Sequence, residues 1–187
     1  MMTVATLLPC VIAMVIRSQG EDTPKQPPQV VPSVDLVRYC GTWYEIAKLP
    51  NRFQKDCTSD VTATYSLLED GDIKVVNRCR KEDGSFSEVE GRAKRADDDE
   101  PLTKLKVRFA PAILSFLWFV WGNYWIIDLS PDYAYAVIGE PDRKYLWILS
   151  RTPEMDESTF QGILGRVKDQ GYDITALLRT KRLATPQ

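Results

Sequence analysis

The sequence contains no histidine among its 187 residues. This absence removes the commonest general base and the commonest zinc ligand, so a Ser–His or Cys–His nucleophile pair cannot exist. The glycine-rich fingerprints of P-loop and dinucleotide-binding proteins are also missing. Catalysis by paired carboxylates stays open in principle, although no acidic pair stands out from the surface charges. We therefore predict that the protein is not an enzyme and holds no cofactor and no metal.

A strong excess of charge of either sign is lacking too. Lysine and arginine number 24 against 26 acidic residues, which gives a formal net charge of -2, and no long basic run occurs. This balance argues against nucleic acid as the main partner. The chain does have a hydrophobic content of 44%, enough for a substantial core, and its length suits one domain plus a leader.

The first residues are almost wholly apolar from Val4 to Ile16, a run that is short for a bilayer span and typical of a signal-peptide core. No lysine or arginine precedes it, and no clear small-x-small cleavage site follows it. We predict a signal peptide or hydrophobic leader over residues 1–20. Cys10 follows Leu-Leu-Pro, a weak match to a lipoprotein box, and an unmodified cysteine is the favoured interpretation. Four prolines in residues 21–33 predict an extended tether.

Eight strand-like runs follow, and Gly, Pro and Asp residues separate them. Short antiparallel strands at this spacing indicate a sandwich or a barrel, and eight strands can close around a single small ligand. The predicted strands lie near residues 41–50, 59–68, 72–80, 86–95, 102–109, 122–129, 133–140 and 144–151.

One helix is predicted after these strands, beginning near Pro153 and Asp156 and ending at Gly171. Apolar residues within it recur at i, i+3, i+4 and i+7, which makes one apolar stripe. The members of this stripe are Phe160, Ile163, Leu164 and Val167.

The eighth predicted strand is apolar on both faces, so both faces must be covered. We expect the helix to lie against the outer face, which carries Leu146 and Ile148, while the other face points into the barrel. Residues 174–178 predict a short final strand.

Three fragments carry a resemblance to a known family: Gly41 to Phe53, the pair Asp132-Tyr133, and Tyr145 to Pro153. Glycine, a lone tryptophan and a short strand ending in Pro-Asn resemble the signature of lipocalins. The chain is most similar to bacterial outer-membrane lipocalins and to their plant temperature-induced and apolipoprotein D relatives. The resemblance implies an all-β fold, an eight-stranded antiparallel up-and-down barrel over residues 34–182 with one α-helix packed outside.

An up-and-down path brings the three fragments to one end of the barrel, which we term the closed end. We expect the guanidinium of Arg151 to lie over the ring of Trp43, a cation–π contact of about 1–2 kcal/mol when desolvated. In the family these positions plug and stabilise the base. The predicted structural signature is therefore Gly41, Trp43, Asp132, Tyr133 and Arg151.

The interior follows from side-chain alternation. If Trp43 points inward, so do Glu45 and Ala47. The eighth strand contributes Tyr145, Trp147 and Leu149. The resemblance places Tyr124, Ile126 and Asp128 inward. Such an interior suits an acyl chain, and the predicted ligand-binding residues are Glu45, Ala47, Tyr124, Ile126, Tyr145 and Trp147. The alternative is that these residues simply fill a small barrel.

The connection over residues 110–121 is unusually apolar for a turn. Because the topology places it at the open end, it predicts a surface that contacts a membrane or a partner. It could instead extend the flanking strands and pack on the rim, or pair with itself in a homodimer. The residues concerned are Leu114, Phe116, Leu117, Trp118, Phe119 and Trp121.

Basic residues and two cysteines also fall toward the open end. The basic residues could bind a phosphate or carboxylate head group, or form a solvated rim. A Cys57–Cys79 disulfide is the preferred pairing, with Cys40 unpaired or buried at the other end, although sequence alone does not settle connectivity. The basic residues are Arg52, Lys55, Arg80, Lys81, Arg143 and Lys144.

These observations predict a lipid-binding lipocalin that stores or transports fatty acids or lysophospholipids. Resemblance to the outer-membrane group implies membrane maintenance and an exported protein at the cell outer membrane or facing the periplasm; secretion is the alternative. A second hypothesis is an interaction or membrane-docking protein that acts through residues 110–121 while its barrel is filled. A third, an isomerase with a cavity thiol, is disfavoured because no histidine can activate the cysteines.

Overall fold

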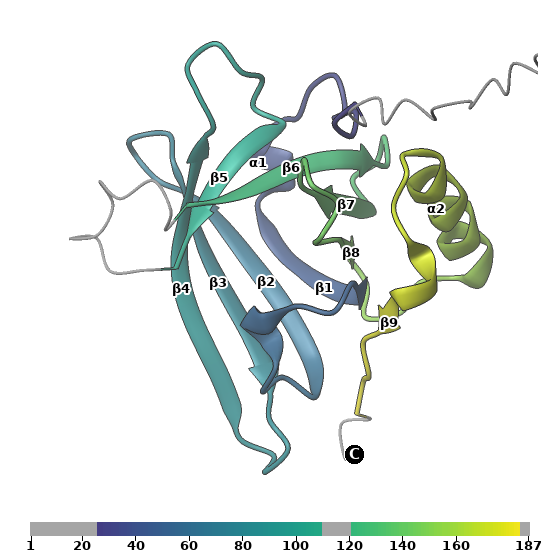
Figure 1. Cartoon of the computed structure of the whole chain (residues 1–187). Helices are drawn as coiled ribbons and strands as arrows, with labels where there is room; N and C mark the ends of the chain where they lie inside the picture. Colours follow the sequence, from purple (N-terminus) through teal and green to yellow (C-terminus); the bar gives the residue numbers. More distant parts are fainter. Residues whose placement is uncertain (1–25, 110–120, 184–187) are drawn as a thin grey trace, which may run out of the picture.

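A computed structural model describes residues 26–109 and 121–183, and its strands form a closed antiparallel barrel (Figure 1). Each of the first eight strands pairs with its neighbour in sequence, and β1 pairs with both β2 and β8, which closes the ring. The predicted eight-stranded up-and-down barrel is therefore confirmed. The strands are β1 (Gly41–Lys48), β2 (Ser59–Leu67), β3 (Ile73–Arg80), β4 (Phe86–Arg95), β5 (Lys104–Arg108), β6 (Gly122–Leu129), β7 (Tyr135–Gly139), β8 (Trp147–Ser150) and β9 (Leu178–Arg179).

The described residues also contain two α-helices and two 3-10 turns. They are α1 (Leu36–Tyr39), η1 (Arg52–Gln54), α2 (Glu157–Asp169) and η4 (Ile174–Ala176), of which η1 and η4 are the 3-10 turns. Helix α1 lies at the closed end, which is at the top of Figure 1, and α2 lies outside the barrel. The turn η1 belongs to the loop between β1 and β2. Within residues 26–109 and 121–183, no helix combines the length and the apolar character needed to cross a membrane.

Helix α2 begins and ends where the sequence predicts. The side chain of Asp156 accepts a hydrogen bond from the Thr159 N–H, so it caps the first turn. At the other end Gly171 has a φ of +84°, and the N–H groups of Gly171 and Tyr172 donate to the carbonyls of Lys168 and Val167. This is a Schellman motif, in which glycine avoids the steric cost of the left-handed conformation.

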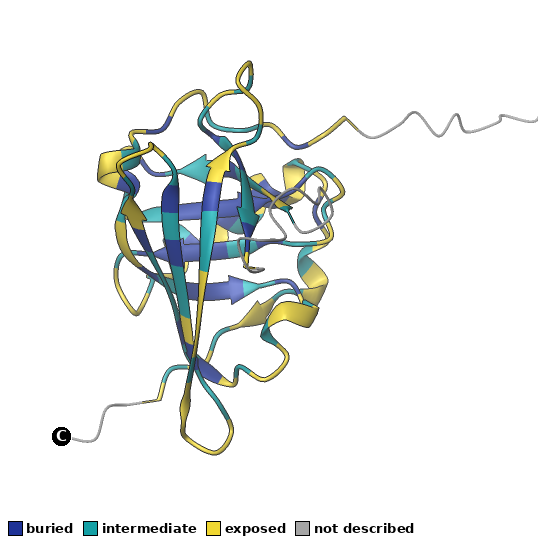
Figure 2. Ribbon diagram, turned by 90° about the vertical axis from the view of Figure 1, so that its left-hand side faces the viewer, coloured by how far each residue is buried: buried dark blue, intermediate teal, exposed yellow. Residues whose placement is uncertain are grey.

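Two apolar clusters divide the core between the inside of the barrel and the space under α2. Burial alternates along the strands, as the blue and lighter segments of Figure 2 show. The helix buries its stripe against the outer face of β7 and β8, as predicted. The outer cluster contains Val137, Leu146, Ile148, Phe160, Ile163 and Val167. The inner cluster contains Tyr39, Trp43, Tyr65, Ile73, Val75, Leu105, Ile126, Ile138 and Leu149.

The end of the chain differs from the prediction of a strand over residues 174–178. Residues 174–176 form η4, and the strand is β9, which pairs with β1 through Arg179 opposite Ala47. The N–H of Thr180 donates to the Ile46 carbonyl at 2.9 Å, and the N–H of Asp60 donates to the Lys181 carbonyl at 3.0 Å. The C-terminal segment therefore fills the wall where β1 and β2 separate near the open end.

The start of the folded domain also differs. Residues 26–33, predicted to be part of a tether, already lie on the barrel: Pro28 is buried, and the Val31 N–H donates to the Ile126 carbonyl at 2.9 Å. Arg143 Nη2 donates to the Gln26 carbonyl at 2.5 Å. The Ile126 N–H donates to the Thr103 carbonyl at 2.8 Å, so its carbonyl is the group that accepts from this segment. The leader predicted over residues 1–20 lies outside the described residues.

Candidate functional site: the barrel interior and its mouth

The closed end is plugged by the predicted contact between Arg151 and Trp43. The Arg151 guanidinium carbon lies 3.7 Å from the Trp43 ring centroid. Arg151 also donates to the backbone carbonyls of Tyr39, Cys40 and Thr42 at 3.0, 2.9 and 3.1 Å. Trp43 is fully buried, and its indole N–H donates to the Tyr39 carbonyl at 2.9 Å. One side chain thus fixes both the tryptophan and the turn leading into β1.

The other signature residues surround this plug. A Cβ at Gly41, where φ is +100°, would lie 3.2 Å from Arg151 Nη1, so glycine gives the guanidinium room. The Asp132 carboxylate accepts from the Ala134 N–H at 3.1 Å and shapes the turn before β7. The Tyr133 hydroxyl accepts from the Asp35 N–H at 2.8 Å, and its ring carries Arg38 at 4.0 Å. The three sequence fragments therefore meet at the closed end.

Above the plug, three tyrosine hydroxyls form a chain inside the barrel. Tyr124 donates to Tyr65 at 2.9 Å, and its oxygen lies 2.7 Å from that of Tyr39. Burial raises the pKa of Tyr65 to about 12 and raises the pKa values of Tyr39 and Tyr124 well above the usual value, so all three remain neutral donors. These rings fill the lower interior. Tyr124 and Ile126 therefore point inward as predicted.

Sequence reasoning missed the other two tyrosines. Tyr65 could have been found by alternation, because Ala63 faces Trp43 in the β1–β2 ladder and Tyr65 lies two residues further. Tyr39 belongs to α1, whose only sequence signal is Asp35, a helix cap that accepts from the N–H groups of Val37 and Arg38.

Two inward predictions are wrong, for the same physical reason. The register of β1 against β8 shifts between Glu45 and Ala47, and Ala47 packs in the outer cluster under α2. The register of β6 against β7 shifts between Ile126 and Asp128, and Asp128 forms an ion pair with Arg166 of α2 at 2.8 Å. Each irregularity adds one residue to the strand, which reverses the direction of the side chains beyond it.

The upper inner wall carries partly exposed apolar side chains beside the polar Asn77. Val89 lies opposite Asn77, which lies opposite the inward-facing Ala63, so Val89 is on the inner face. It is 45% exposed, and Phe109, which follows β5 and covers Gly91, is 39% exposed. Val107 is half-buried beside the inner cluster. The lower half of the barrel is therefore filled, and the inner wall above it keeps exposed apolar surface at Val89 and Phe109; we refer to this upper part as the cup.

Aromatic side chains line one side of the cup's mouth. The Tyr145 and Trp147 rings stack with centroids 5.9 Å apart, and the Phe53 ring of η1 lies 5.3 Å from Tyr145. Phe53 is 62% exposed, whereas Trp147 is half-buried and packs against the inner cluster. Trp147 thus lies beside the inner cluster with Tyr145 stacked on it, and the ligand-binding role of both residues stays a prediction.

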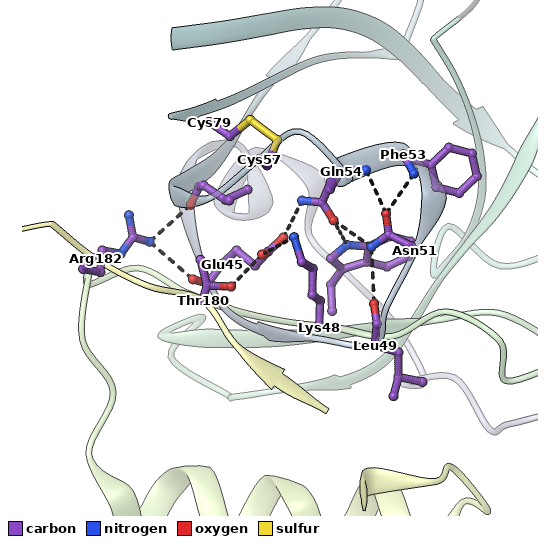
Figure 3. Close-up of polar contacts among 12 residues, drawn as sticks. Glu45, Lys48, Leu49, Asn51, Phe53, Gln54, Cys57, Cys79, Thr180 and Arg182 are labelled. Atoms are coloured by element: carbon purple, nitrogen blue, oxygen red, sulfur yellow. Dashed lines mark hydrogen bonds and ion pairs between the residues drawn. A yellow bond between two sulfur atoms is a disulfide. The ribbon is translucent and has the colours of Figure 1, made fainter. Parts of the chain in front are cut away.

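A polar cluster connects this mouth to the loop after β1 and to the C-terminal segment (Figure 3). Glu45 is 2% exposed, and its carboxylate accepts from Gln54 Nε2 and from Thr180 Oγ1, both at 2.6 Å. Lys48 Nζ lies 3.4 Å from the same carboxylate. Gln54 Oε1 accepts from Trp147 Nε1 at 3.0 Å and from Asn51 Nδ2 at 2.8 Å. Glu45 therefore points inward as predicted and joins three separate segments.

The disulfide between Cys57 and Cys79 is confirmed, and it fastens the loop after β1 to β3 (Figure 3). Cys40 is a free, half-buried thiol near the closed end, and burial raises its pKa. A covalent link at Cys57 and the Gln54 contacts hold both halves of this loop against the mouth.

Half of the predicted basic residues at the open end already have partners. Arg80 forms an ion pair with Asp60 at 2.9 Å, and Lys144 lies 3.4 Å from Asp142. Arg143 donates to the Gln170 carbonyl at 2.6 Å as well as to Gln26. Arg52, Lys55 and Lys81 are exposed or half-buried on the rim. Arg80, Arg143 and Lys144 therefore belong to a solvated rim whose charges pair with other groups of the protein.

Most of the predicted membrane or partner segment lies outside the described residues, namely Leu114, Phe116, Leu117, Trp118 and Phe119. Trp121 is described and half-buried; its ring centroid lies 4.7 Å from Lys94 Nζ and 5.1 Å from the Arg108 guanidinium carbon. Over residues 26–109 and 121–183, no group of three or more acidic or cysteine side chains could hold a metal ion.

A closed eight-stranded barrel plugged at one end by a Trp–Arg contact, with a helix packed outside, defines a lipocalin-type barrel. The family model for the lipocalin-like domain matches residues 34–182, and the chain belongs to the lipocalin family. Lipocalins are generally binding proteins for small lipophilic molecules and not enzymes.

Similar proteins come from distant sources. The chain is 42% identical to temperature-induced lipocalin-1 of Arabidopsis thaliana over 165 residues, which covers 88% of each chain. It is 36% identical to the outer membrane lipoprotein Blc of Escherichia coli strain K12 over 177 residues, 92% of this chain and 95% of the relative. The structure of insecticyanin from Manduca sexta matches with a TM-score of 0.63 at 21% identity over 84% of this chain and 85% of that chain, which supports the fold.

Proposed function

We propose that this lipocalin binds the acyl chain of a fatty acid or lysophospholipid in the cup and stores or carries it. The observation that carries the proposal is the uncovered inner wall: Val89 and Phe109 expose apolar surface inside the barrel above a filled base. An acyl chain laid against this wall removes apolar surface of both partners from water. The aromatic side of the mouth, Tyr145 and Trp147, would contact the upper part of the chain.

The kinship with an outer membrane lipoprotein supports an exported protein that works near a membrane, at the outer membrane or in the periplasm, or after secretion. The disulfide supports the same placement, because disulfides persist in oxidising compartments. Binding without catalysis is the simplest activity for a cup lined by apolar side chains. A role in membrane maintenance follows as part of this proposal.

Affinity should depend on acyl length if the cup holds the chain. Each buried CH₂ is worth about 0.8 kcal/mol before ordering costs, so we expect about three- to tenfold tighter binding for every two methylenes added. The increase should stop when the chain exceeds the cup. Titration calorimetry with lysophospholipids of increasing acyl length measures this slope. Affinity independent of acyl length would contradict the proposal.

A second candidate function is docking through residues 110–121, at a membrane or in a homodimer, with no ligand inside. The apolar sequence of this segment favours it. If the segment docks, replacing Trp118 and Phe119 by serine should reduce co-sedimentation with liposomes, and unchanged partitioning would remove the idea. Native mass spectrometry of freshly purified protein separates the two functions, because retained lipid supports the carrier and an empty dimer supports docking alone.

A further inference from the structure

The side-chain amide of Gln54 occupies a polar niche in the wall of the mouth (Figure 3). Its nitrogen donates to the Glu45 carboxylate at 2.6 Å, and its oxygen accepts from the indole N–H of Trp147 at 3.0 Å. Asn51 supplies a further donor to the same oxygen at 2.8 Å. The amide is therefore held by an acceptor on one side and by donors on the other.

The two side chains that border this niche, Glu45 and Trp147, each have one kind of hydrogen-bonding capacity. An ionised carboxylate can only accept hydrogen bonds, and an indole N–H can only donate one. Glu45 is 2% exposed, and Gln54 and Trp147 are half-buried, so a group in the niche is partly withdrawn from water. An occupant that replaces Gln54 must accept from Trp147, whose indole N–H otherwise loses its acceptor. It must also donate toward Glu45 to replace the bond from Gln54, although Thr180 and Lys48 stay on that carboxylate.

Gln54 reaches this position from the loop after β1 and not from a barrel strand. Glu45 and Trp147 belong to β1 and β8, whereas Gln54 belongs to the three-residue turn η1. The neighbours of Gln54, Phe53 and Lys55, are exposed, and Gln54 itself is half-buried. A rotation of its side chain toward solvent would leave the niche available, bordered by the ring of Trp147 that also lines the cup.

We propose that the niche selects the polar head of the ligand, and that the preferred head is a neutral group that both donates and accepts. A hydroxyl of a monoacylated glycerol, as in monoacylglycerols and lysophospholipids, or a fatty amide has this character. An ionised fatty-acid carboxylate only accepts and would face the buried Glu45 charge, which Lys48 at 3.4 Å offsets only in part. The inference rests on the proposed binding of an acyl chain in the cup.

Three probes with the same acyl chain test this selection: palmitate, 1-palmitoylglycerol and palmitamide, each titrated below its aggregation concentration at a mildly alkaline pH. We expect the glyceride and the amide to bind at least about tenfold more tightly than palmitate, a difference of about 1.4 kcal/mol. Equal or tighter binding of palmitate would overturn the head-group inference while leaving the carrier function intact. Failure of all three probes to bind would instead contradict the carrier function.

Substituting the acidic wall identifies its role. Glu45→Gln keeps the size of the side chain, removes its charge and adds a donor, so we expect selectivity to fall to within about threefold, mainly because palmitate binds more tightly. Glu69→Gln, an exposed residue in the β2–β3 turn at the closed end, makes the same change in charge and should keep the tenfold preference. A purely structural role for Glu45 would weaken all probes by the same factor, and that outcome would overturn the inference.

Removing the resident amide provides an independent measurement. Gln54→Ala leaves the donor of Trp147 and the acceptor of Glu45 without their present partner, so 1-palmitoylglycerol should bind more tightly than to the unmodified protein. The gain should disappear in the double variant with Glu45→Gln. Weaker binding of 1-palmitoylglycerol to Gln54→Ala would show that Gln54 contacts the ligand directly and does not occupy its place, contrary to the inference.

Discussion

Replacing Arg151 by alanine is expected to lower the free energy of unfolding by about 3 kcal/mol. The substitution removes the cation above the buried Trp43 ring and the donors to the carbonyls of Tyr39, Cys40 and Thr42. A desolvated cation–π contact contributes about 2 kcal/mol, and each charge-assisted hydrogen bond contributes further, although such terms do not add fully. Denaturant unfolding monitored by circular dichroism measures the loss.

Arg38→Ala is the matched control for that experiment. Arg38 also stacks on an aromatic ring at the closed end, 4.0 Å from the centroid of Tyr133, but it is exposed to solvent. Its removal should cost less than about 1 kcal/mol, because water weakens the contact. Arg151→Lys should fall between the two, since an ammonium cannot reach several carbonyls at once. Equal effects of Arg38→Ala and Arg151→Ala would contradict the assignment of Arg151 as the plug.

Filling the cup should remove ligand binding without unfolding the barrel. Val107 lies on the inner wall of β5 and is half-buried, opposite Ala93 and Gly122 in the neighbouring strands. Val107→Trp would place an indole in the space assigned to the acyl chain. We expect affinity for a palmitoyl lysophospholipid to fall at least about 100-fold, because the lost apolar contact cannot be recovered elsewhere. Titration calorimetry gives the ratio directly.

Val76→Trp serves as the control, since Val76 lies in β3 on the outer face, next to the inward Val75. It introduces the same side chain in a strand but leaves the interior unchanged, so affinity should stay within about threefold. Circular dichroism checks that both variants keep the barrel. Binding retained by a folded Val107→Trp variant would place the ligand outside the cup.

The sequence predicted the fold because its signals are local and mutually consistent. Turn residues separate runs of strand length, and the stripe of α2 matches the outer face of β8. The Arg151–Trp43 contact followed from strand direction, because an up-and-down path returns three fragments to one end. The predicted inner and outer faces of β8 are also correct, since that strand pairs with β7 without a shift of register.

Where the prediction failed, the cause was non-local. Neither β1 nor β6 carries a glycine or proline at its irregularity, so nothing in the sequence marked the reversal at Ala47 or Asp128. In both strands the extra residue faces α2. The contacts between β1 and that helix join residues more than a hundred positions apart in the sequence. Alternation therefore holds only up to the first bulge.

The polar niche could not be predicted from the sequence either. The sequence indicated that Glu45 points inward, but a lone inward carboxylate has no evident partner. Gln54 of η1 and Thr180 of the C-terminal segment donate to it, and Trp147 of β8 donates to Gln54. Only the folded barrel brings these residues together. The composition of residues 21–33 predicts a tether for a similar reason, because a proline-rich composition does not reveal that Val31 bonds to β6.

The most direct test of the account is to locate a bound acyl chain by NMR. A lysophospholipid labelled in its acyl chain should show intermolecular NOEs to the inner-wall methyl groups of Ala63, Val89 and Val107. It should show none to Ile163 or Val167, which lie under α2 outside the barrel. Contacts confined to the outside of the barrel, or no NOE to any inner-wall methyl group at saturating ligand, would contradict it.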